Sequence, residues 1–250
     1  MVSAGMTTTR GRVRLEPTAK RLRVYLGGLP VADTTSALMV WEAPYYPTYY
    51  IPIKDVVPGV LKEAGPGPHS PSRGDATLYT VTSGGRQAPA IVYADSPIEE
   101  IRDHVRFEWD AMDAWFEEDE EVFVHPRDPY TRVDILPSSR HIRIEVDGQT
   151  VAESRHARIL FETGLPARYY LPKTDVRFDL MEATDTVTHC PYKGSAEYWT
   201  VNGGKDLAWS YRTPLPESQK IAGLVAFYNE KVDVYVDGEL EQRPKTKFSK

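Results

Sequence analysis

The densest group of reactive side chains lies in the segment Thr188-His189-Cys190-Pro191-Tyr192-Lys193-Gly194. A lysine beside a cysteine favours the thiolate, which is the nucleophilic form of the thiol. A partly buried lysine can itself act as a base or form a Schiff base. The segment therefore predicts a catalytic or anion-binding loop. The alternative is a turn in which Cys190 is a small buried hydrophobe and Lys193 is solvated.

Aromatic residues form a second group of candidates. Tyr169 and Tyr170 are adjacent on a predicted strand, so their side chains point to opposite faces. Trp209 and Tyr211 share a face of another predicted strand, and Trp199 lies on a third. Such rings predict an aromatic pocket for a planar ligand. The alternative is that they fill the core of a sheet.

Charged residues complete the candidate site. We expect Asp175 to pair with Lys193 or Arg168, or else to lie in a surface turn. The side chains to which we assign catalytic roles are Lys193, Cys190, Tyr192 and Asp175. Those to which we assign ligand binding are Tyr170, Trp209, Tyr211, Trp199, His189 and Arg168. No residue is assigned to a metal, and we expect no cofactor.

The elements that position these residues occur twice, because the sequence matches itself when shifted by 120 residues. The shift places Tyr49-Tyr50-Ile51-Pro52 on Tyr169-Tyr170-Leu171-Pro172 and Glu42 on Glu162. It also places His69-Ser70-Pro71-Ser72-Arg73-Gly74 on the segment 189–194. The first copy keeps the proline and glycine but has Ser70, Ser72 and Arg73 at the three reactive positions, which puts an equivalent site there in doubt.

The repeat predicts two homologous domains, at residues 12–125 and 130–245, after a disordered tail at residues 1–11. The linker is predicted at residues 125–130, where two prolines interrupt any regular element. Within the second copy, residues 141–146 alternate between apolar and polar, and Asp147-Gly148 marks a hairpin turn. Further strands are expected at 157–161, 168–171, 197–201, 207–211 and 232–236. Apolar spacing of three and four residues over 218–228 predicts a short helix.

Composition excludes several classes of protein. The chain has 250 residues, a net charge of −6 and no basic face of the kind that binds duplex nucleic acid. Its apolar runs are too short to span a bilayer, and its N-terminus lacks a secretory signal, so we expect a cytoplasmic protein without a membrane partner. The single cysteine excludes an intramolecular disulfide. Signatures of phosphate loops, zinc sites, dinucleotide folds and serine hydrolases are missing.

Three elements together carry a family resemblance: Tyr169-Tyr170-Leu171-Pro172-x-x-Asp175-Val176, Cys190-Pro191-Tyr192-Lys193-Gly194 and Ala208-Trp209-x-Tyr211. The chain resembles a tandem member of the bacterial domain-of-unknown-function family 427. The resemblance implies two β-tent-like domains, mainly β, each with curved antiparallel sheets and a short C-terminal helix. Relatives with this fold commonly hold zinc through paired Cys-x-x-Cys motifs, which this sequence lacks. The resemblance implies a site at Tyr170, Asp175, Cys190, Tyr192, Lys193, Trp209 and Tyr211.

Three functions fit these observations. The first is an enzyme that acts on a small organic molecule without a metal, with Lys193 or Cys190 as base or nucleophile and tyrosine hydroxyls holding an oxyanion. Isomerisation, cyclisation, elimination and hydrolysis would each suit such a site. The second is a non-catalytic module that binds a small molecule through its aromatic rings. The third is a structural or interaction protein in which the motif only fixes a turn. The oligomeric state stays open.

Overall fold

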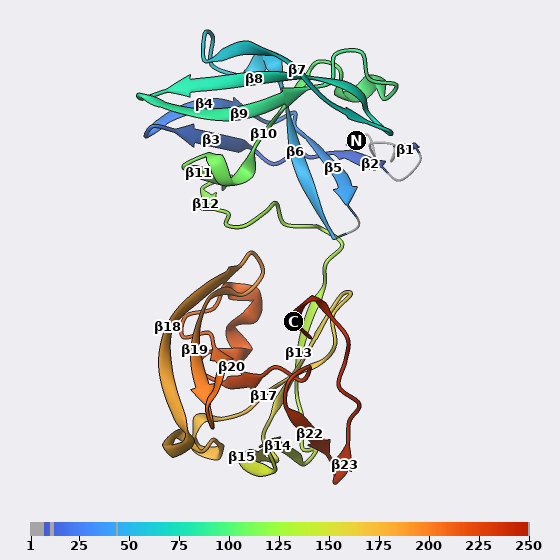
Figure 1. The fold of residues 1–250 in the computed structure, drawn as a ribbon. Helices are drawn as coiled ribbons and strands as arrows, with labels where there is room; N and C mark the ends of the chain where they lie inside the picture. The colour runs from blue at the N-terminus through green and yellow to red at the C-terminus, as the bar shows by residue number, and fades with distance from the viewer. Residues whose placement is uncertain (1–7, 11–12, 44, 250) are drawn as a thin grey trace. The chain divides into compact units, whose positions relative to one another are not determined.

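A computed structural model describes residues 8–10, 13–43 and 45–249, which form two compact units, at residues 1–128 and 129–250 (Figure 1). Both units are built mainly of antiparallel β-sheet. The predicted disordered tail, 1–11, falls largely outside the described residues. Within it, Thr8–Arg10 form strand β1, which pairs with β2 and so departs from the expectation. The predicted linker contains no strand or helix.

The first unit contains an eight-stranded sheet and a four-stranded sheet. The larger sheet has the order β1-β2-β5-β6-β10-β9-β8-β7, and the smaller has the order β12-β11-β3-β4. The strands of the larger sheet are β1 (Thr8–Arg10), β2 (Val13–Pro17), β5 (Leu38–Ala43), β6 (Tyr46–Pro52), β7 (Leu61–Ser70), β8 (Gly74–Ser83), β9 (Arg86–Val92) and β10 (His104–Phe107). Those of the smaller sheet are β3 (Leu22–Leu26), β4 (Leu29–Thr34), β11 (Ala114–Glu117) and β12 (Glu120–Glu121).

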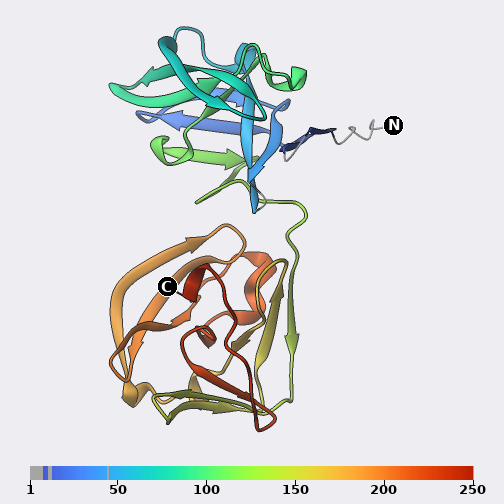
Figure 2. The ribbon, with the colours of Figure 1, turned by 45° about the vertical axis from the view of Figure 1, so that its right-hand side comes forward.

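The second unit repeats this arrangement (Figure 2). Its first sheet has the order β13-β16-β17 and its second β18-β19-β20-β21, and a bridge between Leu171 and Val225 joins the two. The third sheet has the order β15-β14-β22-β23. The strands are β13 (Val133–Pro137), β14 (Ile142–Val146), β15 (Gln149–Ser154), β16 (Arg158–Glu162), β17 (Arg168–Tyr170), β18 (Met181–Cys190), β19 (Gly194–Val201), β20 (Gly204–Ser210), β21 (Val225–Phe227), β22 (Asp233–Val236) and β23 (Glu239–Leu240).

Strand alternation divides the apolar residues of the second unit between two cores. The inner core lies against the β14–β15 hairpin and includes Ile144, Tyr169 and Val225. The outer core covers the opposite face of the joined sheets, and its members are Ile135, Leu160, Tyr170, Ala196, Tyr198, Trp209, Tyr211, Ile221 and Ala226. Tyr169 and Tyr170 therefore face opposite ways, while Trp209 and Tyr211 share a face, as predicted.

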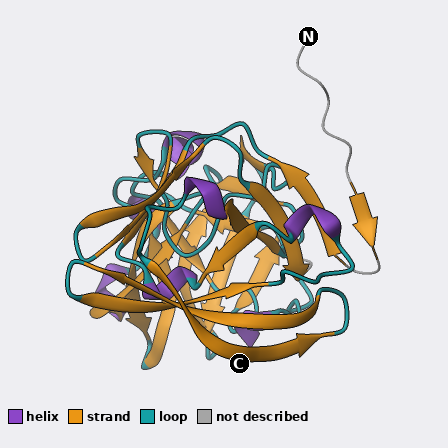
Figure 3. Ribbon diagram, turned by 90° about the horizontal axis from the view of Figure 1, so that it is seen from above, coloured by secondary structure: helices purple, strands orange, loops and turns teal. Residues whose placement is uncertain are grey.

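The predicted short C-terminal helix of each domain is not confirmed, since the helices among the described residues are all 3-10 helices (Figure 3). The seven are η1 (Ile53–Asp55), η2 (Glu99–Ile101), η3 (Trp109–Ala111), η4 (Lys173–Asp175), η5 (Phe178–Leu180), η6 (Pro216–Ile221) and η7 (Lys247–Ser249). The segment 218–228 holds the end of η6 and strand β21. Gly223 separates them at φ +70°, a conformation that no α-helix continues through. Ile221 and Val225 consequently belong to different cores, not to one helix face.

Two hairpin turns touch in the first unit. Gly27, in the β3–β4 turn, and Gly84, in the β8–β9 turn, lie so close that a Cβ at Gly27 would come within 2.3 Å of the Ser83 carbonyl oxygen. A Cβ at Gly84 would lie 2.1 Å from the carbonyl oxygen of Gly27. Only glycine permits this backbone contact. At the position of Gly27 the second unit has Asp147, also at positive φ.

Candidate functional site

The centre of the candidate site is an ion pair between Lys193 and Glu162. Lys193 lies in the turn between β18 and β19 and is only 8% exposed. Its Nζ lies 2.5 Å from Oε2 of Glu162, the last residue of β16. The Leu215 N–H donates to the Lys193 carbonyl oxygen at 3.1 Å, which fixes the turn from the segment that follows β20.

Two buried phenols and the thiol lie beside this pair. The indole Nε1 of Trp209 donates to the Tyr170 hydroxyl at 3.1 Å. Burial raises the pKa of Tyr170 and of Tyr211 well above the usual value for tyrosine. Glu162 and Cys190 also contribute to the rise in the pKa of both phenols, so these four groups lie near one another. Both tyrosines are therefore neutral hydrogen-bond donors at pH 7.

We call Lys193, Glu162, Cys190, Tyr170 and Tyr211 the Lys193 cluster. Strand alternation places Glu162 on the same side of the sheet as Tyr170. Glu162 and Leu160 share one face of β16, and Leu160 and Tyr170 both belong to the outer core. The cluster offers a nucleophile, a cation that can donate a proton and two neutral hydroxyl donors. An ammonium group that donates to a carboxylate is not a free amine, which favours proton transfer over Schiff-base chemistry at Lys193.

The first unit keeps a related arrangement with other residue types. Arg73 forms an ion pair with Glu42, and the Tyr50 hydroxyl donates to Glu42 Oε1 at 2.6 Å. The Arg73 guanidinium also donates to the Tyr50 hydroxyl at 3.2 Å and lies 5.0 Å from the centre of the Tyr93 ring. Its Nε donates to Ser70 Oγ at 3.1 Å. The cation, carboxylate and phenol thus persist, with serine at the position of Cys190.

Of the two alternatives expected for Asp175, the hydrogen bonds support the role in a turn and not the ion pair with Lys193. Asp175 accepts a hydrogen bond from Ser154 Oγ at 2.6 Å, where η4 meets β15. The first unit has the same contact, since Thr34 Oγ1 donates to Asp55 Oδ2 at 2.7 Å. A carboxylate held by a hydroxyl in the same turn of both repeats belongs to the scaffold.

Arg168 lies on the Tyr170 side of β17 but does not pair with Asp175 either. Both of its terminal nitrogens donate to Glu230, at 2.6 and 2.7 Å, and one also donates to Asn229 at 3.1 Å. The guanidinium lies 5.7 Å from the ring centre of Trp209 and 5.8 Å from those of Tyr228 and Phe248. The side chains of Arg168 and Glu230 are both buried, so they form an internal salt bridge beside these aromatic rings.

The remaining predicted ligand-binding residues lie apart from the Lys193 cluster or at its edge. Trp199 packs edge-on against Phe178, beside the inner core and on the opposite face from Trp209. His189 is exposed, and its Nδ1 lies 2.8 Å from Ser195 Oγ. Tyr192 is half-buried in the Lys193 turn, where its carbonyl oxygen accepts from Ser218 Oγ at 3.0 Å.

A comparison with known protein families explains the repeat. The family model described as a domain of unknown function (DUF427) matches the chain twice, at residues 14–118 and 134–238. The chain belongs to this family. No curated protein matches it. Each matched range includes one such cluster, so both DUF427 domains carry a cation, a carboxylate and a phenol, and the Arg73–Glu42 pair is less buried than the Lys193–Glu162 pair.

Other features of the described residues bear on the class of site. No three histidine, cysteine, aspartate or glutamate residues among them are grouped so as to hold a metal ion. Nor does any helix in the described part of this DUF427 chain have the length and apolar character needed to cross a membrane.

A scaffold role for Asp175 makes a first prediction. Asp175→Ala removes the carboxylate that accepts from Ser154 and should lower the free energy of unfolding by about 1 kcal/mol, the typical net contribution of one hydrogen bond. Urea denaturation measures this loss. The rate at which iodoacetamide alkylates Cys190 in the folded protein should stay within about twofold of wild type. A large change in that rate would place Asp175 in the functional site.

Proposed function

We propose that the second DUF427 domain is an enzyme that acts on a small organic molecule without a metal, using the Lys193 cluster. The observation that carries the proposal is the buried Lys193–Glu162 ion pair next to Cys190. Buried ionisable groups beside a nucleophile are a common feature of catalytic sites. We also propose that each domain is β-tent-like, which the curved antiparallel sheets around one inner core support.

Acyl transfer is the reaction type that these groups serve most directly. The Cys190 thiolate would attack a carbonyl carbon, and the Tyr170 and Tyr211 hydroxyls would donate to the oxyanion that forms. Lys193 would give its proton to the leaving group, with Glu162 holding the ammonium in place. Water would then hydrolyse the thioester and regenerate the thiol. Proton transfer between Glu162, Lys193 and the substrate would equally support isomerisation, cyclisation or elimination.

A binding role is the second candidate, and the first domain favours it for its own cluster. Arg73 cannot act as a general acid or base near neutral pH, but its planar fork suits a carboxylate or phosphate. An aromatic clasp around Trp209 has less support, because this residue is only 6% exposed and its indole N–H donates to Tyr170.

The test exchanges residues between the repeats. Cys190→Ser and Lys193→Arg each introduce the side chain of the first domain, so both variants should fold. With p-nitrophenyl acetate as the model acyl substrate, we expect Cys190→Ser to lower turnover at least 100-fold and Lys193→Arg about tenfold.

Ser70→Ala, at the matched position of the first domain, is the control and should leave turnover unchanged. The pH dependence of iodoacetamide alkylation is a second readout. A midpoint near the free-thiol value of about 8.5, together with full turnover in Cys190→Ser, would refute the catalytic proposal.

A further inference from the structure

A pocket of about 460 Å³ in the second domain is lined by residues outside the Lys193 cluster. It is formed by two short segments, residues 137–139 after β13 and residues 155–158 between β15 and β16. Arg158 begins β16 and Glu162 ends it, so their Cα atoms are about 13 Å apart along the strand. Arg158 is also the cross-strand partner of Tyr170, so the pocket adjoins the cluster at that residue but shares no lining residue with it.

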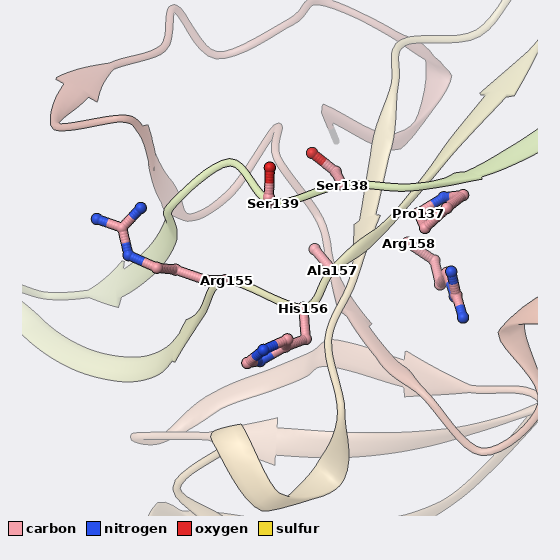
Figure 4. Close-up of a pocket in the computed structure, with 7 residues that line it drawn as sticks. All are labelled: Pro137, Ser138, Ser139, Arg155, His156, Ala157 and Arg158. Carbon is pink, nitrogen blue, oxygen red and sulfur yellow. The ribbon is translucent and has the colours of Figure 1, made fainter.

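The lining of this pocket is basic. Arg155, His156 and Arg158 contribute cationic or imidazole groups, Ser138 and Ser139 contribute hydroxyls, and none of the lining residues is acidic. Figure 4 shows Ala157 at the centre, with the two serine hydroxyls on one side and His156 on the other. Arg155 and Arg158 extend in opposite directions from it.

These arginines differ from their neighbours in the way their charge is balanced. Arg132, Arg140 and Arg143 each form an ion pair, with Asp134, Asp237 and Glu145 respectively. Among the residues that the structure describes, the guanidinium groups of Arg155 and Arg158 form neither an ion pair nor a hydrogen bond. Arg155 only adds a weak attraction that helps to lower the pKa of Asp237, whose main partner is Arg140.

The first domain has the same backbone hydrogen bond at this place but lacks the basic side chains. The Ser138 N–H donates to the Ala157 carbonyl oxygen at 2.9 Å, and Thr18 donates to Ala37 at 3.0 Å in the matching place. The residues there that correspond to the pocket lining are Pro17, Thr18, Ala19, Thr35, Ser36, Ala37 and Leu38, none of which is charged. The backbone frame is shared, whereas the cations occur only in the second domain.

We infer that this pocket binds a small molecule carrying two anionic groups, one for each arginine. A guanidinium group without a carboxylate partner suits an oxyanion, because it can donate two parallel hydrogen bonds. The opposite directions of the two arginines suit two separated anionic groups better than one. The Ser139 hydroxyl and the His156 ring supply further hydrogen bonds between them.

The experiment titrates the full-length protein with pyrophosphate and with succinate at constant ionic strength and follows backbone amide signals by NMR. Saturable shifts confined to residues 137–139 and 155–158 are expected with at least one of the two, and the tighter ligand identifies a diphosphate or a dicarboxylate as the source of the anions. Acetate and inorganic phosphate, each with a single anionic group, should bind at least tenfold more weakly. Equal binding of these controls would overturn the inference.

Two double variants separate a site from general charge. Arg155→Gln with Arg158→Gln should weaken binding at least tenfold. Arg132→Gln with Arg177→Gln removes the same charge from two exposed, ion-paired arginines and should change binding less than twofold. Arg155, Arg132 and Arg177 are exposed and Arg158 is half-buried, and circular dichroism checks that both double variants fold. Equal losses in both double variants, or shifts that never saturate, would show non-specific attraction.

Discussion

Replacing Glu230 with alanine is expected to destabilise the second DUF427 domain by about 3–5 kcal/mol, because it leaves the buried Arg168 charge without its partner. The side chain of Glu230 is fully buried, and that of Arg168 is 8% exposed. Calorimetry should show a lower transition temperature for the second domain and an unchanged transition for the first. A loss below about 1 kcal/mol would mean that water replaces the carboxylate.

The same salt bridge makes stability depend on pH. Burial acts to raise the pKa of Glu230, but hydrogen bonds from Arg168 and Thr246 and attraction to Arg168 outweigh it and hold the pKa below the usual 4.5. A carboxylate with a lowered pKa stabilises the fold fully above its unfolded value and loses that contribution as pH falls through the folded value. The stability difference between wild type and Glu230→Gln should therefore shrink below about pH 4.5. A constant difference down to pH 2 would contradict this assignment.

Removing one partner of the Lys193–Glu162 pair should have a comparable effect. Glu162→Leu leaves an ammonium group buried without a counter-charge, and Lys193→Met leaves a carboxylate, so each should cost about 3 kcal/mol. The double variant removes both charges and should recover most of the loss, since apolar replacement of a buried ion pair is often neutral or stabilising.

Urea denaturation of the four proteins closes this double-mutant cycle. Lys193→Arg is the matched control, because the first domain holds arginine in the same turn, and it should cost less than about 1.5 kcal/mol. Additive losses in the double variant would show that the two charges do not interact in solution.

Much of the fold could be predicted from the sequence because it depends on local alternation and on the repeat. The two-residue period of a strand predicts that the side chains of Tyr169 and Tyr170 point to opposite faces, as they do. The turn residues Asp147-Gly148 predict the hairpin found there. The helix predicted over 218–228 is found only as the 3-10 helix that ends at Ile221, because apolar spacing cannot distinguish one helix face from a chain that passes between two cores. Gly223, at positive φ, was the local signal against a helix.

The candidate site could be predicted only in part, because residues that meet in space come from strands far apart in the sequence. Cys190 and Lys193 were found by their proximity along the chain, but Glu162 was not. The register of the repeat aligns Glu162 with Glu42, and a carboxylate at the same position in both copies is the signal that could have identified Glu162. Asp175 was shared as well, so identity between the repeats could not separate a site residue from a turn residue.

The contact between Gly27 and Gly84 gives the two domains different mechanical properties. In the first domain the ends of two hairpins meet backbone to backbone, so neither tip can shift without displacing the other. In the second domain a Cβ added at Gly148 or at Gly203, in the two corresponding turns, would meet no atom within 4 Å. We therefore expect the backbone amides of the β14–β15 and β19–β20 turns in the second domain to exchange with solvent sooner than those of the β3–β4 and β8–β9 turns in the first.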